Sequence, residues 1–194
     1  KEQFYELYKN NGLTEKLDLE NKDIIKKIFQ EFSKDYAIQD DKIEGYHFIN
    51  RMSFWMATGS GKTLVIVKLI ELLQSLMSKS LIPQKDILFL TYREDLLEQF
   101  KKHIIEFNQG NNAVLINLYD LKNYNSVKRK NKLKFGNEID VFYYRSDLIS
   151  DEQKDKIIDF RNYDNNGNWY ILLDEAHKGD REDSKRQQFY SILS

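Results

Sequence analysis

The stretch MATGSGKT, residues 56–63, combines two glycines with a serine, a lysine and two threonines in a spacing that suits phosphate binding. Gly59 and Gly61 carry no Cβ and can adopt positive φ, so successive backbone N–H groups can point inward at phosphate oxygens. Lys62 adds a full positive charge, and the Thr63 hydroxyl is placed to ligate Mg²⁺ beside the phosphates. We therefore predict a phosphate-binding loop formed by Thr58, Gly59, Ser60, Gly61, Lys62 and Thr63.

This loop departs from the general pattern G-x-x-x-x-G-K-[ST] at one position, because Met56 stands where the first glycine is expected. The first glycine of the pattern begins the turn rather than touching phosphate, so we expect the substitution to cost little. A simple Gly-Ser turn between a strand and a helix is the alternative. The apolar run before the loop and the apolar helix after it favour the phosphate-binding interpretation.

A second group of chemically active residues follows the apolar run WYILL, residues 169–173, which ends in Asp174 and Glu175. Open α/β sheets bind ligands at the carboxyl ends of their strands. There Asp174 can hold Mg²⁺ through its water shell, while Glu175 orients the water that attacks a γ-phosphate or accepts its proton. We predict a nucleotide and Mg²⁺ as cofactors, Lys62, Asp174 and Glu175 as catalytic residues, and Thr63 with Asp174 as the metal site.

The elements that must position these residues are indicated by short apolar runs that alternate with helical patterns from residue 54 onward. Such alternation predicts an α/β fold with a parallel sheet and helices on both faces. The expected strands are residues 54–57, 87–91, 113–118, 139–144 and 169–173. The expected helices are residues 62–78, 94–107 and 151–161.

Local signals complete this division of the chain. Ser150 and Gln153 form a capping box for the helix expected after residue 150, and residues 164–168, DNNGN, form a turn before the last strand. Asn21 can cap an amphipathic helix near the N-terminus. We expect residues 1–50 to be a helical lead-in and residues 51–194 to be the nucleotide-binding domain.

The composition narrows the class of protein without naming a partner. The chain has 194 residues, no cysteine, and 30 Lys plus Arg against 31 Asp plus Glu. The overall charge therefore does not indicate a nucleic-acid partner. No apolar run approaches the roughly 18 residues that span a bilayer. We expect no membrane association, and a cytoplasmic location is the default.

The sequence resembles the superfamily 2 helicases and translocases, because residues 174–177 match the DEAH box of that family. The loop MATGSGKT is similar to that of the motor subunits of type I and type III restriction enzymes. The resemblance implies a RecA-like P-loop NTPase domain that hydrolyses ATP to move on DNA, double-stranded in the parent enzyme. It also implies that His177 couples the nucleotide to nucleic-acid binding, and that methyltransferase or specificity subunits are candidate partners.

The segment LFLTYREDLLEQF, residues 88–100, is similar to motif Ia of this family. By that match Thr91 and Arg93 face the nucleic-acid backbone, while Leu96 and Gln99 hold the helix in place. A solvated helix start at Arg93 is an equal alternative.

The resemblance covers roughly residues 54–180, and motif III, the second RecA-like domain and its arginine finger are not found. We expect the chain to be the first half of a motor, incomplete at its end, that binds nucleotide with little turnover.

Two other interpretations stay open: an RNA helicase of the DEAH type, and a P-loop nucleotide-binding module that binds no nucleic acid. A basic run within residues 126–134 could contact phosphates, although we favour a solvated loop or hairpin. Its charged members are Lys128, Arg129, Lys130, Lys132 and Lys134.

Overall fold

The computed structural model describes residues 6, 9–10, 14, 16–18, 42–44, 54, 56–57, 59–110, 113–130, 137–150, 154–163 and 165–175. The chain divides into two compact units, Lys1–Met56 and Ala57–Ser194. In the first unit, strand β1 (Lys16–Asp18) pairs antiparallel with β2 (Lys42–Glu44), which the sequence patterns did not indicate. The helix expected after Asn21 lies outside the described residues.

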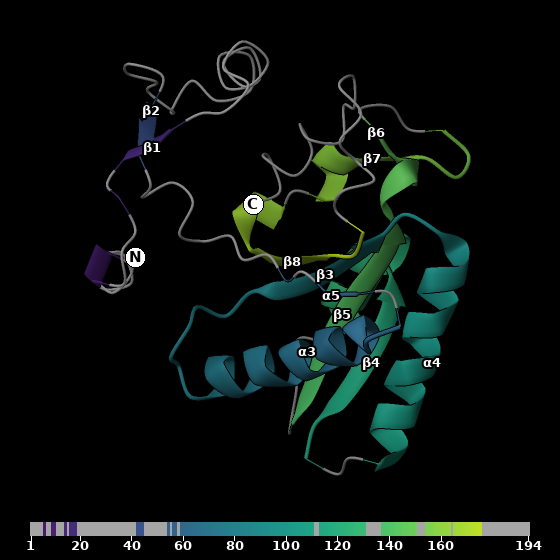
Figure 1. Cartoon of the computed structure of the whole chain (residues 1–194). Helices are drawn as coiled ribbons and strands as arrows, with labels where there is room; N and C mark the ends of the chain where they lie inside the picture. Colours follow the sequence, from purple (N-terminus) through teal and green to yellow (C-terminus); the bar gives the residue numbers. More distant parts are fainter. Residues whose placement is uncertain are drawn as a thin grey trace. The chain divides into compact units, whose positions relative to one another are not determined.

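The second unit is built on a four-stranded sheet in the order β4-β5-β3-β8, and every neighbouring pair of strands is parallel (Figure 1). This confirms the predicted α/β fold with a parallel sheet. The four strands are β3 (Asp86–Thr91), β4 (Leu115–Asp120), β5 (Glu138–Arg145) and β8 (Trp169–Leu173). The α-helices are α3 (Lys62–Ser78), α4 (Glu94–Gly110) and α5 (Tyr124–Lys130).

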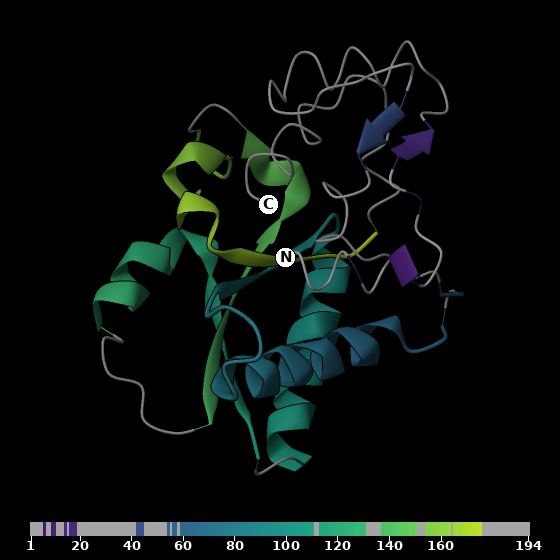
Figure 2. The ribbon, with the colours of Figure 1, turned by 90° about the vertical axis from the view of Figure 1, so that its left-hand side faces the viewer.

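Alternation along the strands sends side chains to two separate cores. Ile87, Phe89 and Val141 pack on one face of the sheet with residues of α3 and α4, such as Phe100. Leu88, Leu90 and Phe142 pack on the other face with residues of α5, such as Tyr124. Figure 2 shows α3 and α4 on one side of the sheet and α5 on the other, so helices cover both faces as predicted.

Two predicted elements are wrong. Residues 54–57 were expected to form a strand, but Phe54, Met56 and Ala57 lie in none, and Phe54 is 56% exposed. Residues 151–161 were expected to be helical, and Ser150 to cap them. Instead Ser150 belongs to strand β6 (Ile149–Ser150), which pairs in parallel with β7 (Ile158–Asp159).

The physical reason for the second error lies in the core. Ile149 and Ile158 are buried side by side against the sheet, so the hydrophobic spacing that suggested a helix serves a short strand pair instead. Short 3-10 helices flank this pair: η3 (Ser146–Leu148) precedes β6, and η4 (Phe160–Tyr163) follows β7.

The turn before β8 is confirmed at Asn165–Gly167, where all three residues have positive φ. Its Asn165 amide donates to Asp86 at the start of β3 (3.0 Å). Asp86 also accepts hydrogen bonds from the Tyr124 hydroxyl (3.0 Å) and from Lys128 Nζ (2.7 Å). This carboxylate therefore ties α5 and the turn to the amino end of the central strand.

The basic run was expected to be a loop or hairpin, but its first part is helical. Lys128 and Arg129 lie in helix α5, and Lys128 forms an ion pair with Asp86. The backbone of Lys130 ends the helix, whereas Lys132 and Lys134 lie outside the described residues. None of the helices that the structure describes is both long and apolar enough to cross a membrane.

We expect Phe100→Ala to lower the free energy of unfolding by about 3–5 kcal/mol, because Phe100 is fully buried and its loss leaves a cavity. Its ring stacks on that of Phe89 with centroids 3.8 Å apart. Urea unfolding followed by circular dichroism measures the change. Ile105→Ala on the same helix is the control, since Ile105 is 56% exposed and should change stability by less than about 0.5 kcal/mol. Equal effects of the two substitutions would contradict this description of the core.

Candidate functional site

The glycine-rich loop turns tightly before helix α3. Gly59 has φ 78° and Gly61 φ 90°, as their lack of Cβ allows. A Cβ added at Gly59 would meet no atom within 4 Å, so the backbone conformation, rather than space, calls for glycine there. Ser60 closes the turn, because its N–H (3.2 Å) and its hydroxyl (2.6 Å) both donate to the Ala57 carbonyl. Thr58 lies outside the described residues.

Helix α3 begins directly after this turn, at Lys62. The first N–H groups of a helix have no partner within the helix and carry partial positive charge. Lys62 and Thr63 occupy the first turn and are half-buried. The start of α3 therefore offers amide donors, an ammonium group and a hydroxyl in one place, which suits an anion with an associated cation.

The carboxyl ends of β3 and β8 place Asp174 beside Thr91. The ladder between these strands ends with Leu90 opposite Leu173, and the Asp174 N–H continues it by donating to the Leu90 carbonyl (2.8 Å). The Thr91 hydroxyl lies 3.4 Å from Asp174 Oδ2, to which it donates. Because side chains alternate along each strand, both of these side chains lie on the sheet face that α3 and α4 cover.

Glu175 leaves the sheet immediately, with φ 56°. Its Oε1 lies 3.3 Å from Lys62 Nζ, an ion pair between residues 113 positions apart in the sequence. The Glu175 side chain is 15% exposed and that of Lys62 33% exposed, so solvent screens the pair only in part. The loop and the DE pair, predicted separately, are therefore brought together by the fold.

The charges of this site favour a cation. Burial raises the pKa of Asp174, and the negative charge of Glu175 raises it further, whereas Lys62 and the Thr91 hydroxyl oppose the rise. One ammonium group, that of Lys62, thus faces the carboxylates of Asp174 and Glu175. Oxygen ligands such as Asp174 and the Thr63 hydroxyl suit Mg²⁺.

In the part of the chain that the structure describes, no group of three or more His, Cys, Asp and Glu side chains could enclose a metal ion. A site with one carboxylate and one hydroxyl is the kind that holds Mg²⁺ together with substrate phosphates rather than in a cage of protein ligands. The residues present therefore fit the predicted ion.

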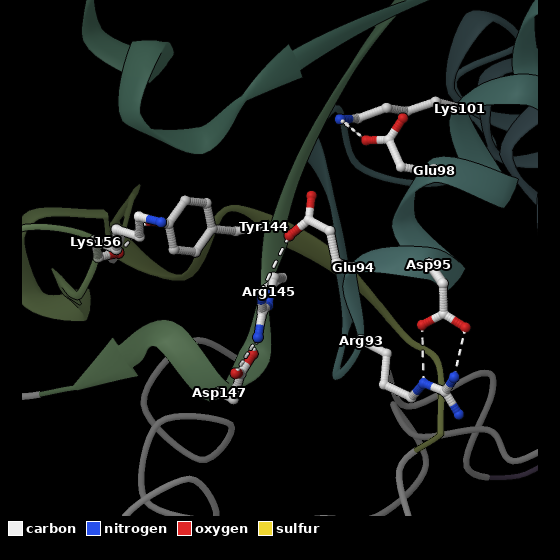
Figure 3. Close-up of polar contacts among 9 residues, drawn as sticks. All are labelled: Arg93, Glu94, Asp95, Glu98, Lys101, Tyr144, Arg145, Asp147 and Lys156. Carbon is white, nitrogen blue, oxygen red and sulfur yellow. Dashed lines mark hydrogen bonds and ion pairs between the residues drawn. The ribbon is translucent and has the colours of Figure 1, made fainter.

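Two arginines, each hydrogen-bonded to acidic side chains, lie farther along the same edge of the sheet (Figure 3). Arg93 donates two hydrogen bonds to Asp95, at 2.8 and 2.6 Å. Arg145, at the end of β5, donates to Asp147 (3.1 and 2.6 Å) and to Glu94 (3.1 Å), and these bonds, that with Asp147 foremost, raise its pKa above the usual value.

Arg145 was missed in the sequence. The available signal was its place directly after the apolar residues of β5, as Asp174 follows those of β8.

One of the expected motif Ia contacts, that of Thr91, needs correction. Thr91 is fully buried and its hydroxyl bonds to Asp174, so its side chain does not face outward to a nucleic acid. Arg93 is 54% exposed and could reach a phosphate. Gln99 is exposed and Leu96 is half-buried, whereas the buried residues of α4 are Leu97, Phe100 and Ile104.

His177, proposed to couple nucleotide and nucleic acid, lies outside the described residues.

The parallel sheet covered by helices on both faces, with a glycine-rich loop opening α3, defines a RecA-like P-loop NTPase domain. The chain belongs to the family described as type III restriction enzyme, res subunit, whose model matches residues 15–193. This family is a helicase superfamily 2 motor domain, an ATP-dependent motor of restriction enzymes. Neither the curated proteins nor the solved structures gave a significant match.

Proposed function

We propose that this chain is the first RecA-like domain of a restriction-enzyme motor, which binds ATP with Mg²⁺ and hydrolyses it to move on DNA. The observation that carries the proposal is the 3.3 Å approach of Lys62 Nζ to Glu175 Oε1. It joins the phosphate loop at the start of α3 to the acids at the end of β8. A nucleotide bound at the loop would therefore have its terminal phosphates next to Asp174 and Glu175.

Each residue has a distinct task in this scheme. Lys62 and the amides of the loop bind the β- and γ-phosphates, and Thr63 with Asp174 holds Mg²⁺. When bound, the ion would neutralise negative charge on the β- and γ-phosphate oxygens. Glu175 orients the attacking water or accepts its proton. Because Lys62 lies within reach of Glu175, phosphate and carboxylate compete for the same ammonium group.

The DNA contact proposed for this domain is the exposed guanidinium of Arg93, at the start of α4. A phosphate that binds there must replace Asp95 as its partner. Such contacts position the protein on the duplex and carry no sequence information, so recognition of a DNA sequence is assigned to other parts of the enzyme. Methyltransferase or specificity subunits are the proposed partners for that task.

The nucleotide site is tested by titrating the protein with a fluorescent ATP analogue in the presence of Mg²⁺. We expect Lys62→Ala to weaken binding at least about tenfold, because charge-assisted bonds to phosphate are lost. Lys68→Ala is the matched control, since Lys68 lies on the same helix and pairs with Glu71 at 2.7 Å. The proposed loop is wrong if Lys62→Ala binds as tightly as the unsubstituted protein.

We expect Arg93→Ala to weaken binding of double-stranded DNA at low salt about threefold to tenfold, as measured by fluorescence anisotropy, because one phosphate contact is removed. Arg161→Ala is the control. Like Arg93, Arg161 is an exposed arginine bonded to an aspartate two residues away, Asp159, but it follows β7 on the other face of the sheet. Equal losses for the two substitutions would place the DNA elsewhere.

We expect residues 1–194 alone to hydrolyse ATP more slowly than about 1 s⁻¹, with or without DNA. The resemblance places the arginine that stabilises the transition state in a second domain, and such arginines contribute roughly 10³ to 10⁵ in rate. Phosphate release measured at saturating ATP gives the turnover number, with Glu175→Gln as the background control. Faster turnover would show that these residues contain a complete catalytic site.

A further inference from the structure

Thr91 is a buried polar residue at the end of strand β3. The four residues before it, Ile87–Leu90, are all apolar and buried, and Thr91 itself is fully buried. A buried hydroxyl needs a hydrogen-bond partner, since an unsatisfied one has lost its bonds to water without replacement. Its partner is the carboxylate of Asp174, with Oγ1 3.4 Å from Oδ2.

Adjacent residues of β3 therefore hold Asp174 at two points. The Leu90 carbonyl accepts the Asp174 N–H at 2.8 Å, which places the main chain, and the Thr91 hydroxyl engages Oδ2, which sets the direction of the side chain. Such support is needed here, because Glu175 turns out of the sheet with φ 56° and the strand ladder ends at Leu173.

The position of the Asp174 carboxylate suits a cation beside the phosphate loop. The Thr91 hydroxyl donates to Oδ2, and the Glu175 backbone also donates to this carboxylate. The carboxylate lies on the sheet face covered by α3, whose first turn carries Lys62 and Thr63. With its direction set by Thr91, the carboxylate can bind a cation beside the phosphate loop.

We propose that Thr91 is a positioning residue of the nucleotide site, whose hydroxyl orients the Asp174 carboxylate for Mg²⁺. The inference deepens the proposed function and rests on it, because it takes Asp174 as the magnesium ligand. It also replaces the nucleic-acid role that the sequence suggested for Thr91 with a role inside the nucleotide site.

The test is the Mg²⁺ concentration that gives half-maximal binding of a fluorescent ATP analogue, which needs no turnover. Thr91→Val keeps the shape of the side chain but removes the hydroxyl. We expect it to raise this concentration about threefold to tenfold, and to leave nucleotide affinity in EDTA unchanged. Thr91→Ser keeps the hydroxyl and should behave like the unsubstituted protein.

A structural role alone would give a different pattern, because a disturbed core weakens nucleotide binding with and without Mg²⁺ alike. Should Thr91→Val fail to fold, Thr91→Ser and Thr91→Ala replace it, since both remove the methyl group and only the second removes the hydroxyl. In the Asp174→Asn background, removal of the hydroxyl should have no further effect on the Mg²⁺ requirement.

The outcomes separate the two proposals. If the unsubstituted protein binds nucleotide with a clear Mg²⁺ requirement that removal of the hydroxyl does not change, the role of Thr91 is overturned and the proposed function stands. If the unsubstituted protein binds no nucleotide, both are overturned.

Discussion

The parallel pairing of β3 with β8 is the constraint on which the candidate site depends. Its register sets Leu90 opposite Leu173, so that the next residues along, Thr91 and Asp174, also lie side by side. Because side chains alternate between the faces of a sheet, a slip of one residue would send Asp174 to the face covered by α5. The packing of partly buried apolar residues on both faces, Leu172 on one and Leu173 on the other, therefore also secures the position of the acid.

The second requirement is a balance of charge at the carboxyl edge of the sheet. Two acids in succession repel one another, and burial adds to the cost of charging Asp174. The backbone turn at Glu175 directs the second carboxylate away from the sheet and to Lys62, where it gains an opposite charge. The fold thus separates the tasks of two adjacent residues, one held by the sheet and the other by the loop.

Much of the fold could be predicted because its signals are local. Helix α3 begins and ends at the predicted residues, since a glycine turn precedes a long apolar pattern, and β8 coincides with WYILL. The helix expected at residues 151–161 was wrong because a local capping signal at Ser150 competed with the pairing of β6 and β7, which only the tertiary structure supplies.

The site residues also divide into those that local motifs indicate and those that depend on the tertiary structure. The phosphate loop and the DE pair are short motifs with a recognisable chemistry, so Lys62, Asp174 and Glu175 could be proposed from the sequence. The burial of Thr91 could not, because it depends on which strands flank β3, and the order β5-β3-β8 is a property of the whole sheet. The contact of Arg145 with Glu94 could not be predicted for the same reason, since the two residues are 51 positions apart in the sequence.

The pairing of Arg93 with Asp95 has a consequence for the lifetime of any contact made there. Asp95 is attached two residues away, so it remains at high effective concentration when a phosphate displaces it. Each displacement exchanges one charge-assisted bond for another, and the net gain in free energy is small. A phosphate held this way would be bound less tightly, and exchanged more readily, than one held by an arginine without a tethered carboxylate.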